Sequence, residues 1–260
     1  MTARALNLDQ LAGALRTQRY GRSITYFELT GSTNDDARAA LSSGAAPGHI
    51  VVAEAQSSGR GSRGRSWASP PGTDLYVSVV DRLPLPLAEL PPLTLAVGLG
   101  IAEAVDELLP TTAPKALVKW PNDVQLAGKK CAGVLVEASL GTLGGDAIVI
   151  GVGLNVNRTD FPAELADSAT SLCLQHAPLD RGRALQVLLE RIEQRVDSFV
   201  RDGAAATARA LRPRLALLDQ PARCDERPGI VRGVADTGAL LFETAQGIEH
   251  IIAGRLLPAP

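Results

Sequence analysis

The sequence predicts an α+β protein, with a mixed, largely antiparallel sheet and helices followed by a small β-barrel. Three observations support this fold class. Apolar segments of strand length follow one another closely and are joined by short glycine turns, which favours antiparallel pairing. Longer segments with helical periodicity lie between them. After Pro213 the chain changes to short strands separated by turn residues, which is typical of a small barrel.

Helices are predicted at five places. Leucines at helical spacing in residues 8–15 predict a short opening helix that ends near residue 21. Ser32 or Thr33 begins the next helix, because cap-forming and acidic residues precede an alanine-rich run. A long amphipathic helix covers residues 93–109 and ends at Pro110, which cannot continue it. Two further helices cover residues 183–200 and 204–211.

Strands are predicted between these helices, with turns at Ala127-Gly128 and at residues 141–145. They cover residues 24–28, 49–54, 75–80, 116–119, 124–126, 131–139 and 146–155. We therefore expect an N-terminal helix in residues 1–22, a large domain of sheet and helices in residues 23–212 and a small domain in residues 213–260.

Composition excludes several classes of protein. The formal net charge is −2 and only 3% of residues are aromatic, which argues against a general nucleic-acid binder. The N-terminus has no apolar signal region, and no long uncharged stretch predicts a membrane span. The three cysteines and three histidines are scattered, so neither a disulfide framework nor a zinc site is indicated. We expect a cytoplasmic protein.

A basic glycine-rich segment, residues 59–67, is the most informative local feature. Its glycines allow positive φ and expose backbone N–H groups. Arg60, Arg63 and Arg65 supply planar donors that match phosphate or carboxylate geometry. The segment therefore predicts a loop that closes over an anion, although a solvated basic turn would have the same composition.

A second informative segment is Lys119-Trp120-Pro121-Asn122-Asp123. Pro121 restricts its neighbour and Trp120 is expected to pack, so Lys119 is held as a fixed positive charge that could act on a phosphate or acyl oxygen. The alternative is an edge lysine beside a buried tryptophan, followed by two turn formers. The sequence contains neither a Walker phosphate loop nor a nucleophile elbow, and residues 151–155 lack a complete dinucleotide fingerprint.

Six segments in this order resemble the biotin protein ligases, which activate biotin with ATP and attach it to a lysine of a carrier domain. The resemblance covers roughly residues 24 to 157, with residues 229–241 supporting the C-terminal domain. The segments are Gly31-Ser-Thr-Asn34, Ala53-Glu-Ala-Gln56, Gly59-Arg-Gly-Ser-Arg-Gly-Arg-Ser-Trp67, Lys119-Trp-Pro-Asn-Asp123, Lys129-Lys-Cys-Ala-Gly-Val-Leu-Val-Glu137 and Gly151-Val-Gly-Leu-Asn155.

The resemblance implies a fold and a site. The fold would be a catalytic domain like that of class II synthetases with a C-terminal SH3-like barrel. The biotin site would comprise Ser32, Thr33, Asn34, Gln56, Arg60, Gly61, Ser62, Lys119 and Gly133. ATP and the adenylate would be bound by Arg63, Arg65, Trp67, Lys119, Asn122 and Asn155. Catalysis would depend on Lys119, Arg60, Arg63 and Arg65, and Asp123 would assist Mg²⁺ that arrives with ATP.

The resemblance also implies partners and alternatives. The acceptor would be a biotin carboxyl carrier protein, and the enzyme a monomer or weak homodimer that binds neither DNA nor membrane. Lipoate or octanoate ligases and transferases share the scaffold, and a biotin-responsive regulatory module is an alternative of another class. We expect no DNA reader domain, because residues 1–23 are too few for a helix-turn-helix. Two positions depart from the family pattern, where Ser62 replaces the usual arginine and Arg255 follows Gly254 in place of an acidic residue.

Overall fold

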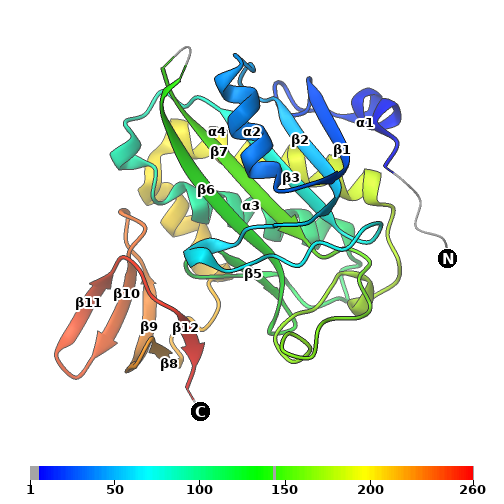
Figure 1. The fold of residues 1–260 in the computed structure, drawn as a ribbon. Helices are drawn as coiled ribbons and strands as arrows, with labels where there is room; N and C mark the ends of the chain where they lie inside the picture. The colour runs from blue at the N-terminus through cyan, green and yellow to red at the C-terminus, as the bar shows by residue number, and fades with distance from the viewer. Residues whose placement is uncertain (1–5, 143–144, 260) are drawn as a thin grey trace.

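The computed structural model describes residues 6–142 and 145–259 and contains two sheets (Figure 1). The larger sheet has the strand order β1-β2-β3-β7-β6-β5-β4. Its strands are β1 Ile24–Thr30, β2 Ile50–Gln56, β3 Leu75–Asp81, β4 Leu117–Lys119, β5 Asp123–Leu126, β6 Lys129–Thr142 and β7 Gly145–Leu154. β1 and β2 pair in parallel, while the other neighbouring strands of this sheet pair antiparallel. The predicted mixed, largely antiparallel sheet is confirmed.

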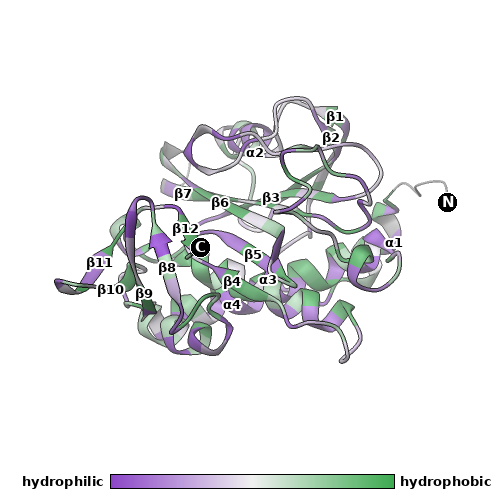
Figure 2. Cartoon of the chain, turned by 90° about the horizontal axis from the view of Figure 1, so that it is seen from below, coloured by the Kyte–Doolittle hydropathy of each residue, from purple (hydrophilic) through white to green (hydrophobic). Residues whose placement is uncertain are grey.

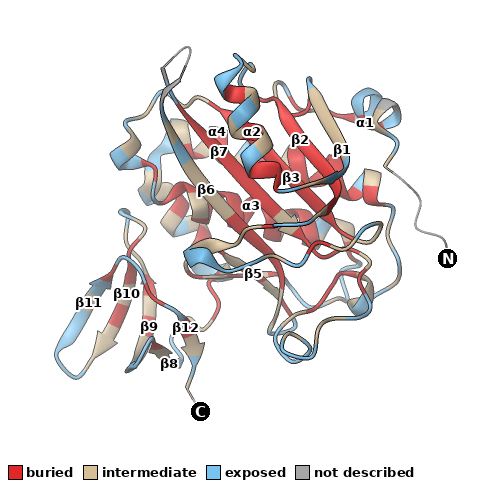
Figure 3. Ribbon diagram, viewed as in Figure 1, coloured by how far each residue is buried: buried red, intermediate tan, exposed pale blue. Residues whose placement is uncertain are grey.

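Helices cover both faces of this sheet. α2, Thr33–Ser42, connects the parallel strands β1 and β2, as a parallel crossover requires, and packs on β2, β3 and β7. α3, Leu93–Leu108, and α4, Arg181–Leu211, lie behind the sheet in Figure 1, and α1, Leu8–Ala14, packs against α4. Buried strands β2, β3 and β7 therefore form the centre of the molecule (Figure 3).

Two helices differ from the predicted pattern. α3 is buried around most of its circumference and not along one face, because it lies between the sheet and α4 (Figure 2). A Cβ on Gly100 would lie 2.9 Å from the Arg191 carbonyl oxygen, so glycine there permits the close approach of α3 to α4. Within α4, Gly203 has φ 78°, so the predicted helices 183–200 and 204–211 form one element with a break between them.

The second sheet follows α4 and is antiparallel, with the order β11-β10-β9-β8-β12. Its strands are β8 Pro221–Cys224, β9 Arg227–Val234, β10 Leu240–Thr244, β11 Gly247–Ile251 and β12 Leu256–Pro258. It contacts the larger sheet at Trp120, whose Nε1 donates to the Gly238 carbonyl at 3.0 Å. A small β unit in this part of the chain was predicted; the domain boundaries at residues 22 and 212 stay a prediction.

A buried ion pair connects α4 to the centre of the larger sheet. Arg181 donates from Nη1 to Glu54 Oε2 at 2.8 Å and from Nη2 to Glu54 Oε1 at 3.0 Å. Burial alone would raise the pKa of Glu54, but the hydrogen bonds and charge of Arg181 outweigh it and lower that pKa. This ion pair holds β2 and α4 together. In the described part of the chain, no helix is long and apolar enough to cross a membrane.

Candidate functional site

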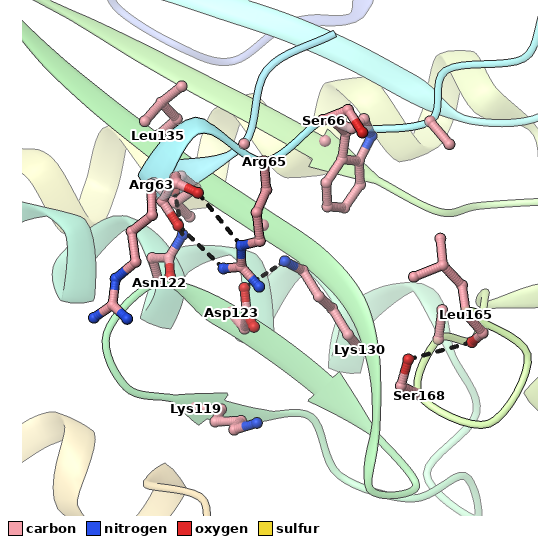
Figure 4. A pocket seen from close by; sticks show the side chains of 18 of the residues that line it. Arg63, Arg65, Ser66, Lys119, Asn122, Asp123, Lys130, Leu135, Leu165 and Ser168 are labelled. Carbon is pink, nitrogen blue, oxygen red and sulfur yellow. Dashed lines mark hydrogen bonds and ion pairs between the residues drawn. The ribbon is translucent and has the colours of Figure 1, made fainter. Parts of the chain in front are cut away.

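One cavity of about 640 Å³ collects the residues singled out from the sequence (Figure 4). It lies at the ends of β4, β5, β6 and β7 and is covered by two loops, which we call the arginine loop, residues 59–69, and the second loop, residues 158–169. The predicted residues that line it are Ser32, Thr33, Asn34, Gln56, Arg60, Gly61, Ser62, Arg63, Arg65, Trp67, Lys119, Asn122, Asp123, Gly133 and Asn155. All predicted site residues therefore meet at one place, although their individual roles stay predictions.

The arginine loop is closed by its own backbone. Trp67 N donates to the Gly59 carbonyl at 2.8 Å, and Gly61 N donates to the Arg65 carbonyl at 2.7 Å. A Cβ on Gly59 would lie 2.5 Å from the Trp67 carbonyl oxygen, so this closure requires glycine. Between the two bonds, Arg63 and Gly64 have φ 60° and 70°. The loop therefore presents its arginines on a narrow turn.

The three arginines have different partners. Arg60 Nη2 lies 2.7 Å from Glu137 Oε2 and 2.9 Å from Asp35 Oδ1, so its guanidinium is held at the β6 side of the cavity. Arg65 donates to the Ser62 backbone and side chain and points toward Lys130 in Figure 4. The remaining arginine of the loop, Arg63, is exposed and 4.0 Å from Asp225 of the second sheet. Arg65 is therefore the arginine best placed to meet an anion in the cavity.

The predicted polar pocket is a connected hydrogen-bond network. Gln56 Oε1 accepts from the Thr33 backbone at 2.9 Å, and Gln56 Nε2 donates to Ser69 at 2.8 Å. Asn34 donates from Nδ2 to Glu137 at 2.7 Å and accepts from the Ser78 hydroxyl at 2.6 Å. Both polar ends of Asn34 are therefore used within the protein, so its side chain shapes the pocket through its neighbours. A glycine at 151 is required here, because a Cβ would lie 2.0 Å from Asn34 Oδ1.

Two glycines on neighbouring strands form a shelf for an aromatic ring. Gly133 of β6 and Gly153 of β7 are register partners. A Cβ on Gly153 would lie 2.4 Å from the Trp67 ring, and one on Gly133 would lie 3.0 Å from it. Gly133 was predicted to let a ligand pass close to the backbone, and in the structure Trp67 lies against it. Trp67 Nε1 and Arg60 Nε are buried without a hydrogen-bond partner, so both offer a donor to a ligand.

Two lysines enter the cavity from strands on either side of β5. Lys119 ends β4, and burial lowers its pKa, with Asp123 opposing and Arg255, Lys130 and Arg65 adding to the shift. Lys130, near the start of β6, lies 2.5 Å from Asp123 Oδ1 and 5.0 Å from the centre of a Trp67 ring. Lys129 and Lys130 belong to a segment that resembles the family, but neither lysine was predicted to act at the site. Alternation along a strand brings only one of two adjacent lysines into the cavity, and contacts across the sheet decide which.

The predicted asparagines are fixed by backbone acceptors. Asn122 Nδ2 donates to the Val134 carbonyl at 2.9 Å and to Ser62 Oγ at 3.1 Å. Asn155 Nδ2 donates to the Thr170 carbonyl at 2.9 Å.

Among the described residues, no group of three or more histidine, cysteine or acidic side chains could hold a metal ion. Asp123 therefore does not belong to a metal-binding cluster, which fits a cation that is carried mainly by phosphates.

The second loop was missed as part of the site. The cavity is also lined by Arg158, Phe161, Glu164, Leu165, Asp167 and Ser168 of this loop. This stretch lacks glycine clusters and has no regular periodicity, so its sequence resembles that of any connection. The chain turns back over the sheet because Asn155 N donates to the Cys131 carbonyl and Thr170 N donates to the Lys130 carbonyl, at 2.8 and 2.9 Å.

Known proteins are similar to this chain in sequence and in fold. The family model described as the Biotin/lipoate A/B protein ligase family matches residues 26–155. A biotin--[acetyl-CoA-carboxylase] ligase of Mycobacterium tuberculosis is 34% identical, covering 95% of this chain and 91% of the relative. The bifunctional ligase/repressor BirA of Bacillus subtilis is 30% identical, covering 95% of this chain and 77% of the relative. The solved biotin protein ligase from Aquifex aeolicus in complex with biotin and ATP is 29% identical, with a TM-score of 0.77 and coverage of 90% and 97%.

Proposed function

The chain belongs to the biotin/lipoate A/B protein ligase family, and we propose that its cavity carries out the two steps of protein biotinylation. The enzyme is a biotin protein ligase. It activates biotin with ATP to biotinyl-5'-AMP and transfers biotin to a lysine of a biotin carboxyl carrier protein. The observation that carries this proposal is the single cavity that joins a polar pocket at α2 and β2 to the arginine loop and two lysines.

In the first step, a biotin carboxylate oxygen attacks the α-phosphorus of ATP, a new P–O bond forms, and the bond to pyrophosphate breaks. We place the ureido ring near the Thr33 and Gln56 groups, because buried polar atoms there favour a ligand with donors and acceptors. The reacting oxygens lie toward Arg65 and Lys130, whose charges stabilise the negative charge that develops in the transition state. Lys119 is assigned the same function from the other side of β5.

In the second step, the neutral amine of the carrier lysine attacks the acyl carbon, AMP leaves, and the nitrogen loses a proton. The loops hold the mixed anhydride and exclude water until the carrier arrives. We place adenine near Asn155 and Trp67 and assign Asp123 to the Mg²⁺ that accompanies ATP. Mg²⁺ would neutralise phosphate charge there, and Asp123 would exchange its contact with Lys130 for the cation.

The enzyme works in the cytoplasm, a reducing compartment that suits its three free cysteines. It acts as a monomer or weak homodimer. It binds no DNA sequence-specifically, because a formal net charge of −2 offers little counterion release.

The decisive test separates biotin from lipoate. Calorimetry should give tight binding of biotin and weak binding of lipoate, because a ligand without the urea offers no hydrogen-bonding groups to the polar atoms that line the pocket. Purified protein with ATP and labelled biotin should release pyrophosphate and form an acid-labile biotinyl-AMP. Preference for lipoate or octanoate would replace the biotin assignment with the alternative acyltransferase, and binding of biotin without pyrophosphate release would indicate a regulatory module.

A further inference from the structure

The side chain of Arg158 lies between the two loops that cover the cavity. It belongs to the second loop, and its Nη1 donates across to the Ala68 carbonyl of the arginine loop at 3.2 Å. Its Nε donates to the Asp160 carbonyl at 3.0 Å, within its own loop. The guanidinium lies 4.9 Å from the centre of the Phe161 ring, which it contacts as a cation on an aromatic face. One guanidinium therefore contacts both loops.

The backbone and surroundings of Arg158 are held in place. Its carbonyl accepts from the Ser171 hydroxyl at 2.5 Å, and the residue is only 9% exposed. The buried carboxylate of Asp74 lies close enough to interact with it electrostatically, and the same carboxylate accepts from Val156 N at 3.0 Å. Because the backbone of Arg158 is held in place, its guanidinium can hold the arginine loop.

The point where Arg158 reaches the arginine loop adjoins the polar pocket. Ala68 lies between Trp67, which packs on the glycine shelf, and Ser69, which donates to the Trp67 carbonyl at 3.0 Å and accepts from Gln56 Nε2 at 2.8 Å. Fixing the Ala68 carbonyl therefore fixes the end of the loop that carries Trp67.

We propose that Arg158 is a positioning residue that couples the arginine loop to the second loop, so that the two close over the adenylate as one unit. Pre-ordering one loop against the other reduces the conformational freedom that is lost when the intermediate is held. The effect on the adenylate rests on the proposed function, whereas the coupling of the loops does not.

Trypsin measures the coupling without any ligand, since the arginine loop offers Arg60, Arg63 and Arg65 as cleavage sites. Arg158→Gln should accelerate cleavage at these sites roughly tenfold, the factor that corresponds to one charge-assisted hydrogen bond. Arg158→Lys keeps the positive charge but loses the planar guanidinium, so its rate of cleavage should lie between those of the parent and of Arg158→Gln. The control is Arg201→Gln, which removes an exposed arginine paired with Asp202. Trypsin should cleave the arginine loop of this variant at the same rate as in the parent. Unchanged cleavage of the arginine loop, or equal acceleration at sites throughout the chain, would overturn the coupling.

Single-turnover kinetics measure the consequence. In Arg158→Gln, biotinyl-AMP should dissociate roughly tenfold faster, while biotin affinity without ATP changes by less than about threefold. If the retention of biotinyl-AMP and the affinity for biotin fall equally, and Arg158→Lys restores neither, Arg158 only supports the fold. If the parent protein forms no adenylate, the proposed function fails, and the trypsin experiment still decides whether the loops are coupled.

Discussion

Lys119 and Lys130 lie on two different strands, and both interact electrostatically with the carboxylate of Asp123. Lys130 has the direct contact, at 2.5 Å, and in Figure 4 it extends toward Arg65 whereas Lys119 lies on the strand below. Burial lowers the pKa of Lys119, which shows that its charge is poorly solvated. A desolvated cation interacts more strongly with developing charge, so Lys119 is expected to act in the transition state. Lys130 is expected to act there because it lies in the same cavity, on the other side of β5.

We predict that Lys119→Ala and Lys130→Ala each slow pyrophosphate release by roughly 100-fold or more, while biotin affinity falls by less than about tenfold. Rapid-quench assays and calorimetry separate the two effects. Lys115→Ala, an exposed lysine outside the cavity, is the matched control and should behave as the parent. Near-normal pyrophosphate release in either variant would reduce that lysine to a structural function.

Ser62 lies where the family pattern has an arginine. Its hydroxyl accepts from Asn122 at 3.1 Å and from Arg65 at 3.3 Å, so the position is inside the cavity but contributes no charge. A charge-assisted arginine contact to phosphate contributes roughly 1.5 to 3 kcal/mol, which is about ten- to a hundredfold in affinity.

We therefore predict that Ser62→Arg slows biotinyl-AMP dissociation about ten- to a hundredfold and reduces stray biotinylation of bystander lysines, with little change in pyrophosphate release during a single turnover. Ser62→Ala removes the same hydroxyl without adding charge and serves as the control. Stopped-flow dissociation at an unchanged rate in the arginine variant would show that Arg65 or Arg63 already holds the phosphate.

At the scale of elements, β6 and β7 act as a pair, because the register that aligns Gly133 with Gly153 creates one flat surface under Trp67. The same strands carry Gly151, against which Asn34 packs. A shift of one residue in the pairing of β6 with β7 would place side chains under the Trp67 ring and against Asn34. Strand register therefore determines the shape of the cavity.

Gly153→Ala should displace the Trp67 ring, because the added methyl group would lie 2.4 Å from it and β7 is paired with a strand on each side. We expect stronger quenching of tryptophan fluorescence by acrylamide and weaker binding of the adenylate. Trp120 is buried and should contribute a constant signal. Gly13→Ala, at a position with open space, is the control; quenching equal to the parent's in Gly153→Ala would show that the ring does not rest on the shelf.

At the scale of the whole molecule, the buried carboxylate Asp74 links the sheet to the second loop and makes stability depend on pH. Burial raises its pKa to about 6, against the opposing effects of the Val156 amide and Arg158. The folded protein thus binds this proton more tightly than the unfolded chain does. Ionisation of Asp74 therefore destabilises the fold. The stability that protonated Asp74 contributes at low pH is lost as the pH rises from about 4 to about 6.

Asp74→Asn keeps an oxygen acceptor for Val156 but cannot ionise. The free energy of unfolding of the variant minus that of the parent should therefore increase between pH 4 and pH 7, by no more than about 3 kcal/mol. Denaturant titrations at several pH values measure this difference, and Asp236→Asn on the surface is the control. A difference that is flat or falls with pH would contradict the raised pKa.

The sequence by itself determined the order of helices and strands and the antiparallel character of most of the sheet, because these features depend on local periodicity and on turn residues. The predicted residues that line the cavity follow from short segments, such as residues 59–67 and 119–123, that resemble those of the family. The predicted turn at residues 141–145 extends over residues 143 and 144, which lie outside the described residues.

Only the tertiary structure decided how those residues are used. It buried α3 on most sides, placed Lys130 in the cavity, engaged both ends of Asn34 and added the second loop with Arg158. Each of these depends on groups far apart in the sequence, such as Asn34 with Glu137 and Arg158 with Ala68. Local propensity cannot specify such pairs, because they form only when strand register and helix packing bring the groups within hydrogen-bond distance.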